Sequence, residues 1–156
     1  MEGIRAARLI IVCGLPGSGK TTLATALERD LNAIRLSADD WMTALSINLW
    51  DEDARANVEA QQWRLAQRLL SLGLIVIVEW GTWARSERDK LRVEARALGA
   101  AVELRCLEAP VDVLLERIQR RRVEYPPIQK ADLISWAEIF QAPTADEMAL
   151  FDAPLT

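Results

Sequence analysis

Short apolar runs alternate with amphipathic segments along the whole chain. The runs with the length and apolar content of buried strands are 8–13, 74–79 and 101–107, and a shorter one lies at 32–37. Between and after them, apolar residues recur at helical spacing in 21–31, 51–73, 86–99, 110–122 and 131–140. This alternation predicts an α/β fold in which helices cover both faces of a parallel sheet, giving three αβα layers.

Local signals predict how some of these helices begin and pack. In 51–73 one face carries Val58, Leu65, Leu69 and Leu72, and Gly73 closes the helix. Ser86 and Asp89 have the spacing of a capping box at the start of the next helix. The tail at 145–156 is ambiguous and is compatible with a short edge strand.

A glycine-rich loop directly follows the first apolar run. It has the spacing G-x-x-x-x-G-K-T from Gly14 to Thr21. Such a loop turns backbone N–H groups around a phosphate, while the lysine reaches the β and γ phosphates and the threonine hydroxyl ligates Mg²⁺. The alternative is a plain glycine turn between a strand and a helix. We predict an ATP site made of Gly14, Leu15, Pro16, Gly17, Ser18, Gly19, Lys20, Thr21 and Thr22.

Acidic residues follow the second and third predicted strands. For a small P-loop kinase the strand order is 2-3-1-4, with room for a fifth strand, which puts Glu79 about 4.8 Å and Asp39 about twice that from the phosphate loop. Glu79 is then expected to act at the Mg²⁺ site with Thr21, and Asp39 to accept the proton of an acceptor hydroxyl. Alternatively, Asp39 or Asp40 caps a short helix, with Asp40 the better candidate, and Glu79 is a core-edge acid paired with an arginine.

Arginines are concentrated near the end of the predicted helix at 110–122. Arg117 and Arg121, with Arg120 and Arg122, are predicted to form a lid over about 117–130 that closes on the transferred phosphoryl group. A solvated helix end, where cations favour the helix dipole, is the alternative. Arg85 and Arg88 follow the third strand and are predicted to face the acceptor.

Tryptophan is frequent, with six in the chain. Trp63 and Trp136 fall on predicted helices and are expected in the core. Trp41, Trp80 and Trp83 lie beside the predicted acids, where they could form an apolar wall for the acceptor. Packing between loop and helix is an equal alternative for these three.

Composition narrows the function classes further. The 156 residues, with a net charge of −4, suit one domain over 1–156 that is a monomer or homodimer and has no basic stripe for nucleic acid. No apolar run is long enough to span a membrane, and we expect a cytoplasmic protein. There is no histidine, and the two cysteines, Cys13 and Cys106, are expected to be small core residues.

Four stretches together resemble a known group. "IVCGLPGSGKTTLATAL", "RLSADDWM", "IVIVEWGTWARSERDKLRVEARALGA" and "DLISWAEIFQAPTADEMALFD" look like small bacterial P-loop ATP-binding proteins described as AAA-family ATPases. These are similar to the zeta-toxin, chloramphenicol phosphotransferase and polynucleotide kinase branch of P-loop kinases. The resemblance implies that Lys20 and Thr21 serve the nucleotide, that Asp39 activates the acceptor, and that the arginines at 117–122 form the lid.

The chain also departs from that branch at two positions. Glu79 stands where relatives commonly have Asp, and Ala38 stands where polynucleotide kinases have Arg. The second departure makes a nucleic-acid acceptor less favoured. We therefore predict an ATP- and Mg²⁺-dependent phosphotransferase acting on a hydroxyl of a small metabolite or antibiotic. The alternatives are a polynucleotide or nucleoside 5′-hydroxyl kinase, and an ATP-dependent switch with slow hydrolysis.

Overall fold

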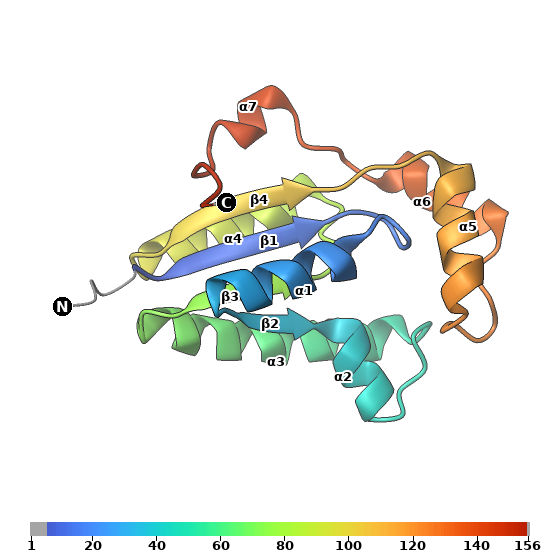
Figure 1. Ribbon diagram of the computed structural model, residues 1–156, viewed down its shortest axis with the longest axis horizontal. Coiled ribbons are helices and arrows are strands. Elements are labelled where there is room, and N and C mark those ends of the chain that lie inside the picture. Colours follow the sequence, from blue (N-terminus) through green and yellow to red (C-terminus); the bar gives the residue numbers. More distant parts are fainter. Residues whose placement is uncertain (1–5, 156) are drawn as a thin grey trace.

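Four parallel strands form the central sheet of the computed structural model, which describes residues 6–155 (Figure 1). Their order is β2-β3-β1-β4, as the sequence predicts. The strands are β1 (Arg8–Cys13), β2 (Ile34–Ser37), β3 (Ile75–Glu79) and β4 (Ala101–Cys106). Arg8 is in register with Ile75 of β3 and with Ala101 of β4. All four strands therefore end at one edge of the sheet.

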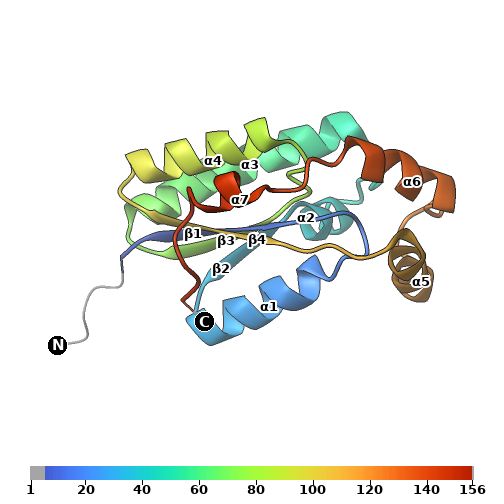
Figure 2. The same cartoon turned by 90° about the horizontal axis from the view of Figure 1, so that it is seen from above.

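Helices cover both faces of this sheet and its carboxyl edge. They are α1 (Lys20–Leu31), α2 (Ala38–Ala44), α3 (Glu52–Ser71), α4 (Arg85–Ala97), α5 (Val111–Arg121), α6 (Lys130–Ile139) and α7 (Ala145–Met148). Figure 2 shows α1 on one face, α3 and α4 on the other, and α5 and α6 beyond the carboxyl ends of the strands. The three αβα layers predicted from the sequence are confirmed.

The alternation of side chains along β1 divides the core in two. Leu9 and Ile11 pack with residues of α3 and α4, whereas Ile10 and Val12 pack with α1. Because successive side chains of a strand point to opposite faces, one apolar run serves both layers. A third apolar cluster joins the phosphate loop to α5, α6 and the segment between them through Leu15, Leu114, Ile118, Ile128 and Leu133.

The buried face of α3 differs from the predicted one. Leu65 and Leu72 are exposed, and the buried residues are Val58, Gln62, Trp63, Ala66 and Leu70. A polar residue can occupy this face because Gln62 donates to the Ser37 carbonyl at 3.0 Å and accepts from the Trp80 indole at 2.7 Å. The spacing of the leucines therefore predicted the wrong face of α3. Gln62 can be buried on the actual face because both its amide nitrogen and its amide oxygen have hydrogen-bond partners.

Two predicted helix caps are also wrong. The N-cap of α4 is Ala84 and carries no side-chain cap, so Ser86 and Asp89 form no capping box. Instead the side-chain oxygen of Gln141 accepts from the Arg85 backbone N–H at 2.8 Å. Ser37 caps α2 by accepting from the Asp40 backbone N–H, so neither Asp39 nor Asp40 is the cap.

The tail adds no strand within the described residues. Asp152 lies beside β4. Its backbone N–H donates to the Val102 carbonyl at 2.8 Å, and its carboxylate accepts from the Val102 N–H at 2.7 Å. These two bonds occupy the outer edge of β4 without extending the sheet. None of the helices between residues 6 and 155 has the length and hydropathy required to cross a membrane.

Candidate functional site: a phosphate loop and an acidic cavity

The phosphate loop joins β1 to α1 at the carboxyl edge of the sheet. Gly17 and Gly19 have φ of 80° and 100°, which disfavour any residue with a Cβ. A Cβ on Gly17 would also lie 2.7 Å from the Leu114 carbonyl oxygen of α5. The glycines thus let the loop turn over the N-terminus of α1 while α5 packs closely against it, which is the arrangement that cradles phosphates.

Lys20 is the first residue of α1 and turns back over the loop. Its Nζ donates to the carbonyls of Gly14 and Leu15 at 2.9 and 3.0 Å. Burial lowers the pKa of Lys20 to about 8, against the opposing effect of the carboxylates of Asp39 and Glu79. Asp39 is the larger of these two influences, so the acid after β2 lies within electrostatic reach of the phosphate-binding lysine.

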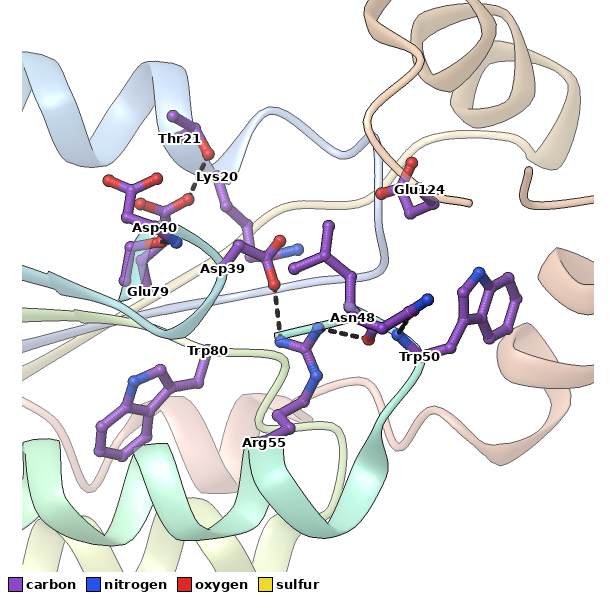
Figure 3. A network of polar contacts seen from close by, with 12 residues as sticks. Lys20, Thr21, Asp39, Asp40, Asn48, Trp50, Arg55, Glu79, Trp80 and Glu124 are labelled. Carbon is purple, nitrogen blue, oxygen red and sulfur yellow. Dashed lines mark hydrogen bonds and ion pairs between the residues drawn. The ribbon is translucent and has the colours of Figure 1, made fainter. Parts of the chain in front are cut away.

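Glu79 ends β3 and is held by two partners. The hydroxyl of Thr21 donates to one carboxylate oxygen (Figure 3). Arg35 of β2 donates to the other at 2.6 Å. The second Arg35 amino group bonds Asp40 at 2.5 Å. Glu79 therefore touches the predicted Mg²⁺ ligand Thr21 and is also, as the alternative held, an acid paired with an arginine.

The donor set at Thr21 and Glu79 fits Mg²⁺. Hydroxyl and carboxylate oxygens are the ligands this ion prefers, and it commonly keeps several waters and binds through substrate phosphates. Among residues 6–155 there is no group of three or more His, Cys, Asp or Glu side chains placed to hold a metal ion. Thr21 would ligate the ion directly, and Glu79 would hold Thr21 and the ion's water shell.

Asp39 lies in the first turn of α2 and is oriented by α3. Arg55 Nη1 donates to Asp39 Oδ1 at 2.6 Å, and its Nη2 donates to the Leu49 carbonyl at 2.9 Å (Figure 3). Asp39 Oδ2 has no hydrogen-bond partner among the described residues. One oxygen is thus anchored while the other remains able to accept a proton.

A single cavity of about 500 Å³ connects these groups. Its lining includes Gly14, Lys20 and Thr21 from the loop and α1, Asp39 and Arg55 from α2 and α3, Glu79 from β3, and Arg117 and Arg121 from α5. Lys20, Thr21, Asp39 and Glu79, which the sequence assigns to the nucleotide, the metal and the acceptor, therefore line one space. This volume lies within the range of small-molecule sites.

The predicted lid at about 117–130 covers the end of α5, the segment 122–129 and the first residue of α6. Arg117 donates to the Gly17 carbonyl at 3.2 Å, and Arg121 pairs with Glu124 at 2.8 Å. Both line the cavity, because residues four apart share one helix face. Arg120 pairs with Glu116 on the exposed side, so the four arginines do not act as a single group.

Four tryptophans line the cavity, Trp50, Trp80, Trp83 and Trp136, and three of them form one cluster. Trp136 of α6 packs against Trp50 and against Trp83, with 5.8 Å between ring centroids in each pair. Trp136 thus borders the cavity, although the sequence analysis placed it in the core. Trp50 was not among the residues that the sequence predicted for the site. The Trp50 indole also donates to the Pro126 carbonyl at 2.6 Å and ties the α2–α3 loop to the lid.

Trp41 and Trp80 differ in their relation to the cavity. Trp41 belongs to α2 and packs against the core cluster on the α3 and α4 side, outside the cavity lining, so packing with a helix describes it. Trp80 is largely buried, and its ring meets Trp63 edge-on at 6.3 Å, but it also lines the cavity. Packing and a place at the cavity wall therefore both describe Trp80.

The two arginines after β3 also lie outside the cavity. Arg88 is fully buried, where it pairs with Glu147 at 2.7 Å and donates to the carbonyls of Thr82 and Gln141. Arg85 is half-exposed and lies 3.6 Å from Asp89. The prediction that Arg88 faces an acceptor is wrong, because its guanidinium holds α4 to the tail.

The site has the architecture of one class of enzyme. Strand order 2-3-1-4, with a phosphate loop after β1, is that of the P-loop kinases. Residues 9–143 match the family model of an AAA domain, and the chain belongs to this family. The resemblance inferred from sequence to a P-loop kinase branch is thereby confirmed.

Similar proteins include both curated sequences and solved structures. An uncharacterized protein of Mycobacterium tuberculosis (strain H37Rv) is 36% identical over 129 residues, which cover 73% of this chain and 26% of that protein. The chain thus spans about a quarter of that relative. A gluconokinase from Sinorhizobium meliloti 1021 is 25% identical with a TM-score of 0.62, covering 91% of this chain and 79% of the other.

Further structures share the fold alone. A chain of the Pnkp1/Rnl/Hen1 RNA repair complex is 22% identical with a TM-score of 0.71, covering 86% of this chain and 44% of that one. Two other neighbours of this fold were solved in complex with ADP-AlF3 and with AMPPNP. At these identities the likenesses show the fold that this chain shares with them.

Proposed function

We propose that this chain transfers the γ-phosphoryl group of ATP to a hydroxyl group of a small molecule. The observation that carries the proposal is the position of Asp39. Its carboxylate is the strongest charged neighbour of Lys20, lines the same cavity, and has one oxygen anchored by Arg55 and one without a partner. A phosphate-binding lysine and an oriented carboxylate around one space are the two groups that hydroxyl phosphorylation needs.

The reaction follows from this arrangement. The acceptor hydroxyl oxygen forms a bond to the γ-phosphorus, and the bond between that phosphorus and the β–γ bridging oxygen breaks, releasing ADP. The hydroxyl proton passes to the free oxygen of Asp39. Lys20 neutralises charge on the β and γ phosphates once its ammonium leaves the Gly14 and Leu15 carbonyls for them.

The remaining residues orient and enclose the reacting groups. Arg117 and Arg121 line the cavity from α5, where they are suited to stabilise charge spread over the transferred oxygens and to exclude water. Mg²⁺, when bound by Thr21, would neutralise charge on the phosphates. In this proposal one domain carries the whole activity, with 117–130 as its lid.

A screen of hydroxyl compounds tests the proposal. The chain is incubated with Mg·ATP and each compound, and phosphorylated product is detected by mass spectrometry. Lys20→Ala should lower transfer at least about 100-fold, because charge stabilisation at the phosphates is lost. Lys90→Ala removes an exposed lysine of α4 and should leave transfer unchanged.

Two results would favour the alternatives. Efficient phosphorylation of an oligonucleotide 5′-hydroxyl, with no small acceptor used, would identify a polynucleotide kinase. Slow ATP hydrolysis that no acceptor increases would identify a nucleotide-dependent switch.

A further inference from the structure

Three of the cations that line the cavity come from α1 and α5. Lys20 begins α1, and Arg117 and Arg121 come from α5. Two lining acids, Glu124 after α5 and Glu79 of β3, are each paired with an arginine. The lining residues from α2, α3 and α4 include four acids and one cation: Asp39, Glu52, Glu59, Glu87 and Arg55. The part of the cavity formed by these three helices therefore carries an excess of negative charge.

Glu59 has no cation of its own to balance its charge. It has no hydrogen bond or ion pair among residues 6–155, and burial raises its pKa to about 7. The negative charges that act on it are those of Glu87, Asp39 and Glu52, and the cation that opposes them is Arg55. Because Arg55 already bonds Asp39 at 2.6 Å, it leaves Glu59 without a partner of its own.

Such an arrangement is unfavourable in the chain alone. Like charges placed close together and partly removed from water raise the free energy of the ionised state. A bound cation would relieve that cost and would gain more from the same carboxylates than it could in water. The excess acid is therefore a basis for selecting the charge of a ligand.

The aromatic residues define a second property of the same space. Trp50, Trp83 and Trp136 all line the cavity, and the ring of Trp136 packs against each of the other two. Tryptophan faces bind the apolar side of a ring and also attract cations. An acceptor in contact with both the acids and the tryptophans would thus combine a compact ring or chain with a positive charge.

We infer that the phosphate acceptor is a hydroxyl compound that carries a protonated amine, as an amino sugar does. The inference rests on the proposed phosphotransferase function and adds the charge of the substrate. The amine is bound by Glu59 and Glu87, the carbon skeleton by the tryptophans, and the hydroxyl by Asp39. Acceptors rich in phosphate, nucleic acid included, are disfavoured because the acids of α2, α3 and α4 repel them.

Three pyranoses that differ in charge test the inference. Glucosamine, glucose and glucuronate are offered separately with Mg·ATP at pH 7, where the amine of glucosamine is protonated and its charge favours the ionised form of Glu59, and kcat and KM are measured for each. We expect kcat/KM to be about tenfold or more higher for glucosamine than for glucose, as one partly desolvated charge pair would give. Glucuronate should be the poorest acceptor.

Variants connect the preference to the named residues. Glu59→Gln and Glu87→Gln should each reduce the preference for glucosamine over glucose, and should do so through KM. Glu138→Gln, which alters an exposed acid of α6, should leave the preference intact. If Glu59 has a structural role alone, Glu59→Gln will change kcat/KM for glucosamine and for glucose by the same factor, and the inference fails.

The outcomes separate this inference from the proposed function. Transfer to glucose or glucuronate that equals or exceeds transfer to glucosamine would overturn the inference while the chain remained a small-molecule kinase. Absence of transfer to all three sugars would also count against it. The broad hydroxyl screen with Lys20→Ala decides the proposed function independently of either result.

Discussion

Arg55 of α3 holds Asp39 of α2 through a 2.6 Å ion pair, although the two residues are sixteen positions apart. The same guanidinium bonds the Leu49 carbonyl, so it also fixes the segment between the two helices. Arg55 touches Asp39 rather than Lys20, and in our account it is a positioning residue. It fixes the direction of the carboxylate that would take the acceptor proton.

Removing the Arg55 guanidinium should slow phosphoryl transfer without changing the affinity for Mg·ATP. We expect Arg55→Met to lower kcat about 10- to 100-fold, because small displacements of a catalytic group have effects of that size. Mg·ATP affinity, measured by calorimetry, should remain within about twofold. Arg55→Lys should restore part of the rate, and Arg64→Met, at an exposed position of the same helix, should have no effect. Equal losses in nucleotide affinity and rate for Arg55→Met would contradict the positioning role.

Arg35 should support Glu79 in a comparable way. Arg35→Met leaves the nearly buried Glu79 carboxylate without its cation, and we expect a loss of roughly 3 kcal/mol in the free energy of unfolding. The Mg²⁺ concentration needed for half-maximal transfer should also change, because Glu79 bonds Thr21. Arg29→Met breaks an exposed pair on α1 and should cost under about 1 kcal/mol. If Arg35→Met and the parent need the same Mg²⁺ concentration for half-maximal transfer, Arg35 has no role at the metal site.

The buried pair of Arg88 and Glu147 should matter for stability. Both side chains are almost fully buried, so Arg88→Met should destabilise the fold by roughly 3–5 kcal/mol in urea unfolding. Arg88→Met combined with Glu147→Leu should recover much of that loss, since no unpaired charge remains. Arg85→Met should cost under about 1 kcal/mol, because its pair with Asp89 is half-exposed. An Arg88→Met chain as stable as the parent would refute this account of the tail.

Glu59 should make stability depend on pH in a known direction. Its pKa is raised from 4.5 to about 7 in the folded chain, chiefly by burial, so the folded state binds more protons than the unfolded state between these values. The contribution of Glu59 to stability is then fully present below pH 4.5 and is lost as pH rises through about 7.

Glu59→Gln removes this dependence. In urea unfolding the variant should be more stable than the parent at pH 8, and the difference should shrink at pH 5. Glu138→Gln is the matched control, because that acid is exposed. A Glu59→Gln chain that follows the parent at both pH values would show that Glu59 is not desolvated in the fold.

The sequence predicts those parts of the site that depend on neighbouring residues or on strand ends. Gly14 to Thr21 form one continuous loop, and Asp39 and Glu79 follow parallel strands, so their shared location follows from the topology. Arg35 and Arg55 escaped prediction because neither belongs to a local motif. Their roles depend on the direction of a long side chain toward a partner on another element.

The errors at Arg88 and Trp136 have a related origin. A lone arginine early in a helix is usually exposed, and nothing near Arg88 indicates that Glu147, 59 residues away, will bury it. Trp136 has the helical spacing of a core residue, yet its neighbours are Trp50 and Trp83 at the cavity. Burial against a distant segment and burial against a cavity look the same in sequence.

Asp39→Asn provides the most direct test of the central claim, measured as acceptor phosphorylation and Mg·ATP binding on the same preparation. The amide keeps the shape of the side chain but cannot take the hydroxyl proton, so transfer should fall about 10²- to 10⁴-fold. Nucleotide affinity should stay within about twofold. Transfer that is unchanged, or a loss of nucleotide affinity as large as the loss of transfer, would contradict the assignment of Asp39 as the base of a hydroxyl kinase.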